Sequence, residues 1–392
     1  MTHGGRGAAL AGALLLGARC TVEWSGGATS FTLPKVQAER VDELALPLAA
    51  GGELRAKELC GDVDVRVDAG PPRLVVRWRG YGDDAADAQQ ALAEARVDVT
   101  GDAAAVELRV IAPTRDGQAR AQADLELVLP QDVALRLDTS MGDLVVAGPL
   151  RSAELDTRYG DVRATAIAGD VRARSSSGDV ELSKVGGAVD ATTAYGDVTL
   201  RGCTGAKMEA TSSSGDVEVG DGGSADWRLE SKYGDVRLAG GAGSLSIATS
   251  SGKVEVTGFT GSVRARDGYG DVELAGRFSG VDAESSSGDV SLRLEGIDGA
   301  LREVVLESKY GDVELVACVP LDAELVAKTS YGEVECELPI AVTKRDEDDK
   351  RLEGRISAAE GPEAPAAGAN GAGTLLRLTT ASGDVRVRRG GR

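Results

Sequence analysis

The feature that most constrains this chain is a short motif that returns at nearly fixed intervals. The tetrad Ser/Tyr-Gly-Asp-Val, or a close variant, places its glycine at 142, 160, 178, 196, 215, 234, 252, 270, 288, 311, 332 and 383, after an early copy at Gly61. The spacing is 18 or 19 residues from Gly142 to Gly288, and then 23, 21 and 51. Such a period is typical of folds that grow by stacking one unit on the next.

Each unit contains two short segments in which apolar and polar residues alternate, as in residues 178–193. Alternation of this kind predicts strands with one buried face. A Gly-Asp hairpin meander and a parallel β-solenoid both fit such a pattern. We favour the solenoid, because each residue then stacks on its counterpart about 4.8 Å away, and a slip of one residue would turn the core face outward. We therefore predict an all-β fold, a right-handed, single-stranded β-helix with coils of about 18 residues.

Composition excludes several classes of function. The 392 residues carry a net charge of −19, which argues against a nucleic-acid surface and against binding to an anionic membrane. The only histidine is His3, in the leader, so His-based catalytic triads and zinc sites are excluded. The 53 glycines and 13 aromatic residues fit a thin core filled by Val, Leu and Ala rather than a thick one.

The pattern divides the chain into six expected segments. Residues 1–19 resemble a signal peptide, because Arg6 precedes an apolar run of eleven residues. This apolar run is too short to span a bilayer. The expected remainder is a linker over 20–49, a capping region with first coils and a helix near Asp84–Ala95 over 50–136, a regular solenoid over 137–340, a flexible insertion over 341–373, and a final coil with a basic tail over 374–392 that closes that end. Export to the periplasm, the outer envelope or the cell surface follows from the first segment.

The cysteines indicate no metal site. Cys20 directly follows the leader and is a candidate for lipid attachment, although Arg19 occupies a position where a lipobox has a small residue. The others, Cys60, Cys203, Cys318 and Cys336, form no CxxC pair, so we favour small buried residues over thiolate ligands and leave disulfide pairing open.

An aspartate follows the repeat glycine in ten of the twelve later copies, and stacking would align these residues in a column. One hypothesis places calcium between the coils, as in β-rolls, although those use a different Gly-x-Asp spacing. The favoured interpretation is that each carboxylate accepts hydrogen bonds from turn amides. The candidate calcium ligands are Asp161, Asp179, Asp197, Asp216, Asp235, Asp271, Asp289 and Asp312.

Every tyrosine of the chain precedes a glycine, and in the regular run tyrosine alternates with serine at this position. The favoured interpretation is packing, with each ring over the small corner of the next coil. The alternative is an aromatic row that stacks on sugar rings or on a protein partner. The candidate binding residues are Tyr159, Tyr195, Tyr233, Tyr269, Tyr310 and Tyr331.

The sequence resembles the bacterial DUF4097 family, which is also named for adhesins. The resemblance rests on Gly52-Glu53-Leu54, the strand that ends Leu127-Val128-Leu129-Pro130, and serial SSSGDVEL and SKYGDVEL units, and it covers roughly residues 50–338 and 375–388. It implies a β-solenoid, often on exported or envelope-anchored proteins, and supplies no catalytic residues.

We therefore expect a monomeric, non-enzymatic interaction scaffold of the cell surface or envelope that needs no cofactor and has an unidentified protein or glycan surface as partner. The alternatives are a calcium-stabilised or carbohydrate-binding β-roll and, less favoured, a polysaccharide-active β-helix enzyme. An enzyme should break the repeat with a local cluster of acid and base, and the acidic residues here recur uniformly.

Overall fold

The computed structural model describes residues 36–115, 118–357 and 373–391. They form two compact units, unit 1 up to Ser175 and unit 2 from Ser176. Strands dominate both units, and the described residues contain one α-helix. The leader, Cys20 and His3 lie outside the described residues.

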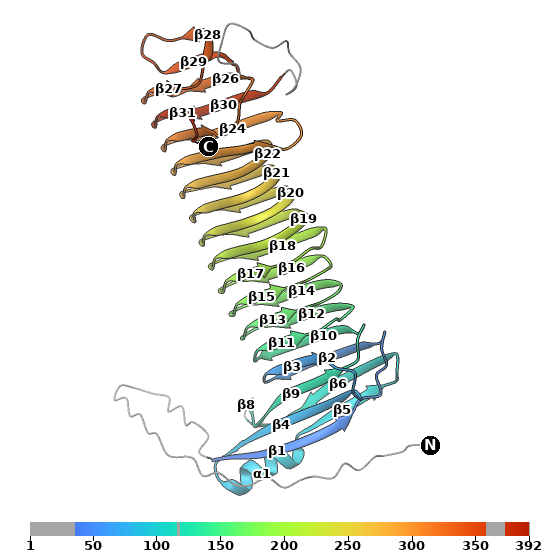
Figure 1. Ribbon diagram of the computed structural model, residues 1–392. Helices are drawn as coiled ribbons and strands as arrows, with labels where there is room; N and C mark the ends of the chain where they lie inside the picture. Colours follow the sequence, from blue (N-terminus) through green and yellow to red (C-terminus); the bar gives the residue numbers. More distant parts are fainter. Residues whose placement is uncertain (1–35, 116–117, 358–372, 392) are drawn as a thin grey trace, which may run out of the picture. The chain divides into compact units, whose positions relative to one another are not determined.

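Unit 1 contains stacked coils that each give one strand to each of two parallel sheets (Figure 1). The first sheet has the order β6 (Ala105–Ile111), β2 (Glu53–Cys60), β10 (Ala134–Met141), β12 (Ser152–Thr157) and β14 (Asp170–Ser175). The second has the order β9 (Ala121–Leu129), β3 (Val63–Val67), β11 (Leu144–Ala147) and β13 (Val162–Thr165). The parallel β-solenoid is thereby confirmed in this unit.

Antiparallel strands close one end of unit 1. The strands β1 (Val36–Ala45) and β4 (Arg73–Gly82) pair with each other, and β4 continues the second sheet by pairing with β9, while β5 (Arg96–Gly101) pairs with β6. A short pair, β7 (Thr114–Arg115) and β8 (Gln118–Ala119), lies outside these sheets. The assignment of residues 20–49 to a linker is wrong over 36–45, because β1 pairs with β4 along its whole length.

The helix α1 (Ala85–Glu94) falls where the Ala-rich stretch predicts it. Asp84 caps its N-terminus by accepting a hydrogen bond of 2.8 Å from the amide of Asp87. Its C-terminal end is fixed by Arg40 of β1, which donates to the carbonyl oxygens of Leu92 and Ala95. The helix therefore covers the antiparallel end of unit 1, as expected for a cap.

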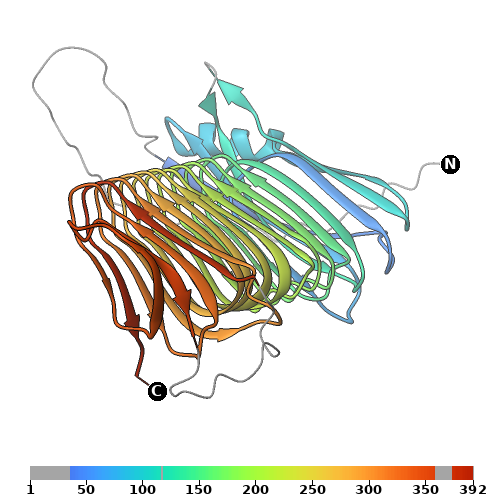
Figure 2. The ribbon, with the colours of Figure 1, turned by 90° about the horizontal axis from the view of Figure 1, so that it is seen from above.

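Unit 2 repeats the same coil in a regular parallel stack (Figures 1 and 2). Each of the strands β19 to β22 is long enough to run through both sheets of its coil. The strands of the coils are β15 (Val180–Ser183), β16 (Val189–Thr193), β17 (Val198–Arg201), β18 (Lys207–Ser212), β19 (Val217–Ser231), β20 (Val236–Thr249), β21 (Val254–Asp267), β22 (Val272–Ser285), β23 (Val290–Ile297), β24 (Glu303–Ser308) and β25 (Val313–Ala317).

The core of unit 2 is a thin layer of stacked apolar side chains between the two sheets. Valines at the start of each coil form one column, in which Val198 pairs with Val217 and Val217 with Val236. The aromatic residues Trp227, Phe259 and Phe278 are also buried, where the coils of β19 to β22 turn opposite the Gly-Asp corner. Alternation along each strand therefore decides which side chains enter the core.

The C-terminal coil lies inside the stack instead of closing it. The strands β30 (Leu375–Thr380) and β31 (Val385–Arg389) pair in parallel with β24 and β25 on one side. On the other side they pair in parallel with β26 (Ala323–Lys328) and β27 (Val334–Cys336). The prediction that residues 374–392 close the end is wrong. The coil of β26 and β27 lies beyond them, and β30 and β31 fill the place in the stack between that coil and β24 and β25.

An antiparallel hairpin covers the far side of β26. It consists of β28 (Ile340–Arg345) and β29 (Arg351–Ile356), and β29 pairs with β26 over six residues. The expectation of a flexible insertion over 341–373 is therefore wrong for residues 341–356, and residues 358–372 lie outside the described residues. A charged terminal strand such as β28 is a known means of protecting a sheet edge from further pairing.

Candidate functional site

The repeated Gly-Asp corner is held together by hydrogen bonds between coils. Where a Ser or Thr stands three residues before the glycine, it is buried. From Thr157 onward its hydroxyl donates to a glycine carbonyl oxygen of the neighbouring coil, at 2.8 Å from Ser231 to Gly215. The same hydroxyl oxygen accepts from the amide of its own glycine, Gly234, at 2.9 Å. The other hydroxyls that donate in this way belong to Thr157, Ser175, Thr193, Ser212, Thr249, Ser285, Ser308, Thr329 and Thr380.

Glycine is required at the corner because adjacent backbones approach closely. A Cβ on Gly234 would lie 2.1 Å from the carbonyl oxygen of Gly215, and one on Gly252 would lie 1.9 Å from that of Gly234. A Cβ does not tolerate such a contact with backbone, so this close approach explains why glycine recurs at the corner.

The aspartate column links the coils. The Oδ1 atom of Asp197 accepts a hydrogen bond of 2.8 Å from the amide of Asp216, the residue at the same position in the next coil. The same bond is accepted by Asp143, Asp179, Asp216, Asp235, Asp271, Asp289, Asp312 and Asp384. In the part of the chain that the structure describes, no group of three His, Cys, Asp or Glu side chains is placed to hold a metal ion. The hydrogen bonds fit the turn-amide interpretation, with the amide supplied by the neighbouring coil, and calcium binding stays a prediction.

Some of these carboxylates also bind arginine. Arg237, two residues after Asp235, lies 3.0 Å from Oδ2 of Asp216 and also pairs with Asp235. Arg386 bridges Asp312 and Asp384 in the same way, and in unit 1 Arg163 lies 2.6 Å from Asp161. By contrast, no Lys or Arg of the described residues forms an ion pair with Asp197, Asp271 or Asp289.

The six candidate tyrosines face solvent. Their exposed fractions lie between 56% and 82%, so interpretation of the rings as packing residues over the neighbouring corner is wrong. The side chain two residues before each tyrosine is buried on the inner side of the corner, which leaves the tyrosine outside. Tyr81 differs, because it is half-buried and donates to Oε1 of Gln122 at 3.0 Å, and burial raises its pKa.

The inserted C-terminal coil completes the alternation of tyrosine and serine in unit 2. In sequence, Tyr310 and Tyr331 occupy consecutive copies of the motif, which breaks the alternation. In the structure the coil that carries Ser382 lies between them, since Asp384 donates its amide to Asp312 and accepts from the amide of Glu333. The order along the stack is Ser177, Tyr195, Ser214, Tyr233, Ser251, Tyr269, Ser287, Tyr310, Ser382 and Tyr331. We call the five tyrosines of this row, with the serines between them, the Tyr/Ser ladder.

One corner of the ladder departs from the repeat. Asp267 stands where the other coils have Ser or Thr, and its Oδ2 atom is buried and has no hydrogen-bond partner. Both Oδ2 and the carbonyl oxygen of Gly252 lie within 2.7 Å of the point that a Cβ on Gly270 would occupy. Burial raises the pKa of Asp267, and the amides of Gly268, Gly270 and Tyr269 oppose this effect. A protonated carboxyl would restore the donor that the hydroxyl supplies elsewhere.

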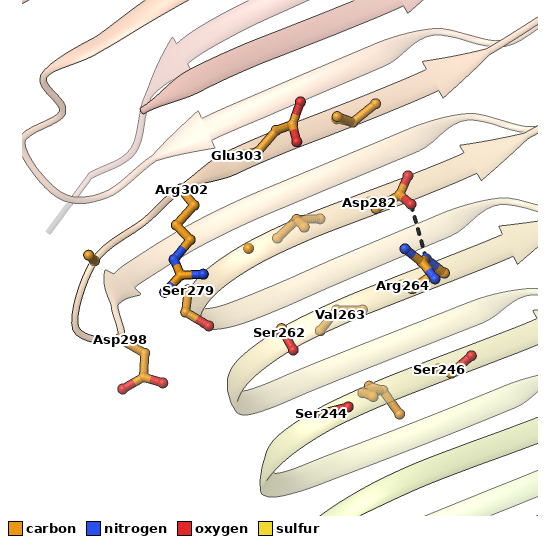
Figure 3. A pocket seen from close by; sticks show the side chains of 15 residues that line it. Ser244, Ser246, Ser262, Val263, Arg264, Ser279, Asp282, Asp298, Arg302 and Glu303 are labelled. Carbon is orange, nitrogen blue, oxygen red and sulfur yellow. Dashed lines mark hydrogen bonds and ion pairs between the residues drawn. The ribbon is translucent and has the colours of Figure 1, made fainter. Parts of the chain in front are cut away.

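A polar groove lies at the coil whose spacing lengthens to 23 residues, between Gly288 and Gly311. Its volume is about 850 Å³, and its floor carries the stacked serines Ser244 and Ser262 (Figure 3). Arg302, Asp298 and Glu303 come from the chain between β23 and β24 and its continuation, and Arg264 forms an ion pair of 3.1 Å with Asp282 (Figure 3). The groove has no aromatic side chain. Sequence reasoning missed it, although the lengthened spacing was a visible signal.

The four cysteines of the described residues are free thiols. Cys203 is buried, whereas Cys60, Cys318 and Cys336 are half-buried. Burial raises the pKa of Cys203, Cys60 and Cys336, which disfavours the thiolate needed for metal binding or nucleophilic attack. No helix in the described residues is both long and apolar enough to cross a membrane.

Comparison with known proteins gives the family of this chain. No curated protein matches the sequence. A solved structure from Clostridium sporogenes ATCC 15579, called a "putative cell adhesion protein", matches with 8% identity and a TM-score of 0.21, over 90% of this chain and 100% of that chain. The model of the Toastrack DUF4097 family matches residues 21–240, 121–296 and 228–362. Because these matches cover most of the sequence, the chain belongs to the Toastrack DUF4097 family.

Proposed function

We propose that this protein is an exported, non-enzymatic interaction scaffold that binds a partner at the cell surface or envelope through the Tyr/Ser ladder. The observation that carries this proposal is the exposure of Tyr195, Tyr233, Tyr269, Tyr310 and Tyr331 in one row of unit 2. Exposed aromatic rings are costly in water unless they serve a contact, and a single row of them is a typical binding surface.

The distribution of charge supports a binding role over catalysis. Most acidic side chains of the corners accept backbone amides or pair with arginine, so they are committed to the stack. The groove beside the lengthened coil holds carboxylates and arginines, but Asp282 is already paired with Arg264 and Arg266. General acid-base catalysis requires a carboxyl or another base that is available to the substrate and poised in pKa. The repeated surface offers many equal contacts instead, which suits multivalent binding.

The proposal is tested by replacing all five ladder tyrosines with serine, the residue that the repeat itself uses at alternate positions. Purified parent and variant are mixed with envelope fragments of the source bacterium, and the sedimented fraction of each is measured. We expect the parent to sediment and the variant to remain in solution. Arg264→Ser, which changes an exposed side chain of the groove, is the control. Equal sedimentation of the parent and the five-fold variant would refute a binding role for the ladder.

Export is tested separately. A chain with a C-terminal epitope tag is compared with one that lacks residues 2–19, and both are located by cell fractionation. We expect the tag in the envelope or outside the cell only when the leader is present. Metabolic labelling with a fatty acid, compared between the parent and Cys20→Ala, decides whether Cys20 carries a lipid.

A further inference from the structure

The spacing of the Tyr/Ser ladder restricts the conformation of a polymer that could bind along it. Tyrosines recur every second coil, at roughly 9.6 Å, which is twice the distance between neighbouring strands. The row of five therefore extends over about 38 Å. A polymer that contacts each ring equally must itself repeat at this distance.

Among the regular conformations of a polypeptide, one has a matching repeat. The α-helix repeats every 5.4 Å or so, and a β-strand about every 6.8 Å. The polyproline II helix has three residues per turn and a rise of about 3.1 Å, so it repeats about every 9.3 Å. Over the length of the ladder the mismatch accumulates to only about 1 Å. A polyproline II segment can therefore place one residue of each turn against successive tyrosines.

The side chains around the ladder fit such a segment. The serines between the rings are small and exposed, which leaves a gap beside each ring for a proline. Aromatic-lined surfaces with gaps of this kind are the usual docking sites for polyproline II peptides, whose preformed shape lowers the entropy lost on binding.

Charge selects among such peptides. Every tyrosine coil of unit 2 has an acidic residue directly after its glycine, namely Asp197, Asp235, Asp271, Asp312 and Glu333. The one lysine of this column, Lys253, belongs to a serine coil and pairs with Glu273 at 2.8 Å. The other serine coils carry an aspartate at this position as well, so an acidic column runs beside the rings along the whole ladder. The opposite side of the ladder is less acidic, and Lys232 lies 5.2 Å from the centroid of the Tyr233 ring.

We infer that the Tyr/Ser ladder binds an extended, proline-rich and basic peptide segment in the polyproline II conformation, parallel to the stacking direction of unit 2. In this arrangement one residue per turn contacts a tyrosine, and a lysine or arginine at another position of the turn faces the acidic column. The inference rests on the proposed function only in taking the ladder as an interaction surface.

The test uses a fluorescent 15-residue peptide with five Pro-Pro-Lys repeats and the full-length protein. Fluorescence anisotropy measures the Kd, and Ala-Ala-Lys repeats of equal charge serve as the matched peptide. We expect the proline peptide to bind at least about tenfold more tightly than the alanine peptide, because only the former is preorganised. We also expect its affinity to rise with the number of repeats up to the length of the ladder.

Variants of the protein make the test specific. Tyr233→Ser with Tyr269→Ser should weaken binding roughly tenfold or more, since two aromatic contacts are lost. Asp271→Asn retains an oxygen that can accept the amide of Asp289, and it should weaken binding mainly at low salt. Arg264→Ser should bind like the parent, and equal melting temperatures show that each variant is folded.

Three outcomes would overturn the inference: equal affinity for the two peptides, equal affinity of the parent and the double tyrosine variant, or no binding. A neutral β-linked oligosaccharide, chitohexaose, is titrated in parallel. If it binds in a tyrosine-dependent manner and the peptide does not, the ligand is a glycan and the peptide inference fails, while the proposed function stands. If envelope binding also survives loss of all five tyrosines, the proposed function fails as well.

Discussion

At the scale of single residues, the corner glycines illustrate how a close approach of backbones determines sequence. We predict that Gly234→Ala lowers the free energy of unfolding by about 2 kcal/mol or more, because its Cβ would meet the carbonyl oxygen of Gly215 at 2.1 Å. Gly220→Ala is the matched control, since nothing lies within 4 Å of its Cβ. Urea unfolding measures both, and similar destabilisation by the two substitutions would contradict this account of the corner.

Asp267 is the second residue for which we predict an effect on stability, and this effect depends on pH. Because its pKa is raised on folding, the folded state keeps a proton that the unfolded chain has released. Stability should therefore fall as the pH rises above about 4, the usual pKa of an aspartate, toward the raised value. Asp267→Ser restores the hydroxyl of the other coils, and we expect it to add about 1–3 kcal/mol at pH 7, by removing an unpaired buried group.

This prediction is measured by urea unfolding of the parent and Asp267→Ser between pH 4 and pH 7. The difference between the two should be smallest at the acidic end and should grow with pH. Asp282→Asn serves as a control for a partly exposed aspartate with arginine partners. A constant difference across the range would show that protonation of Asp267 does not control stability.

At the scale of elements, the C-terminal coil is the least ordinary part of the fold. The strands β30 and β31 pair on both sides, so their removal leaves β24 and β25 on one side and β26 and β27 on the other without partners. We predict that deleting residues 373–392 abolishes amide protection in β26, β27 and the β28–β29 hairpin, while β15 to β22 remain protected. Hydrogen exchange with mass spectrometry measures this, with a chain that lacks only 390–392 as control.

Retained protection of β26 in the shorter chain would show that this coil folds onto β24 directly and that β30 and β31 are not obligatory between them. The opposite result, loss of protection throughout unit 2, would mean that the stack folds as one cooperative unit instead of coil by coil. Stacked repeats generally lose structure from an end, because each coil contacts only its neighbours.

The elements also show which features sequence reasoning can reach. The period of Gly234 and its counterparts, together with the alternation of Val180 and Leu182, is enough to predict the strands, their register and their parallel stacking. The position of Ser382 between Tyr310 and Tyr331 could not be derived, because the repeat gives each coil its shape and not its place in the order. The hairpin over residues 341–356 was missed for a different reason: the charges of an exposed edge hairpin resemble those of a loop.

The exposure of the tyrosines was equally out of reach. Period-2 alternation assigns inward and outward faces within a strand, but Tyr233 lies at a corner, where the chain turns and the alternation carries no information. What decides its direction is Ser231, whose hydroxyl occupies the inner side of the corner. That bond depends on a carbonyl group of the neighbouring coil and is visible only when the stack is assembled.

At the scale of the whole molecule, the calcium hypothesis predicts that bound calcium contributes to the stability of the stack. We predict that the melting temperature is the same in millimolar calcium and in EDTA, because Oδ1 atoms of the aspartate column accept backbone amides and arginines bind several of the Oδ2 atoms. A calcium site that contributed to folding would add about 2.7 kcal/mol with the ion at a hundred times its Kd. For a chain of this length such a gain would raise the melting temperature by several degrees.

Magnesium at the same concentration controls for the general effect of divalent ions on a chain of net charge −19. A rise with calcium alone, removed by EDTA, would reassign the aspartate column as a cation site, whereas an equal rise with both ions would reflect screening of the acidic surface.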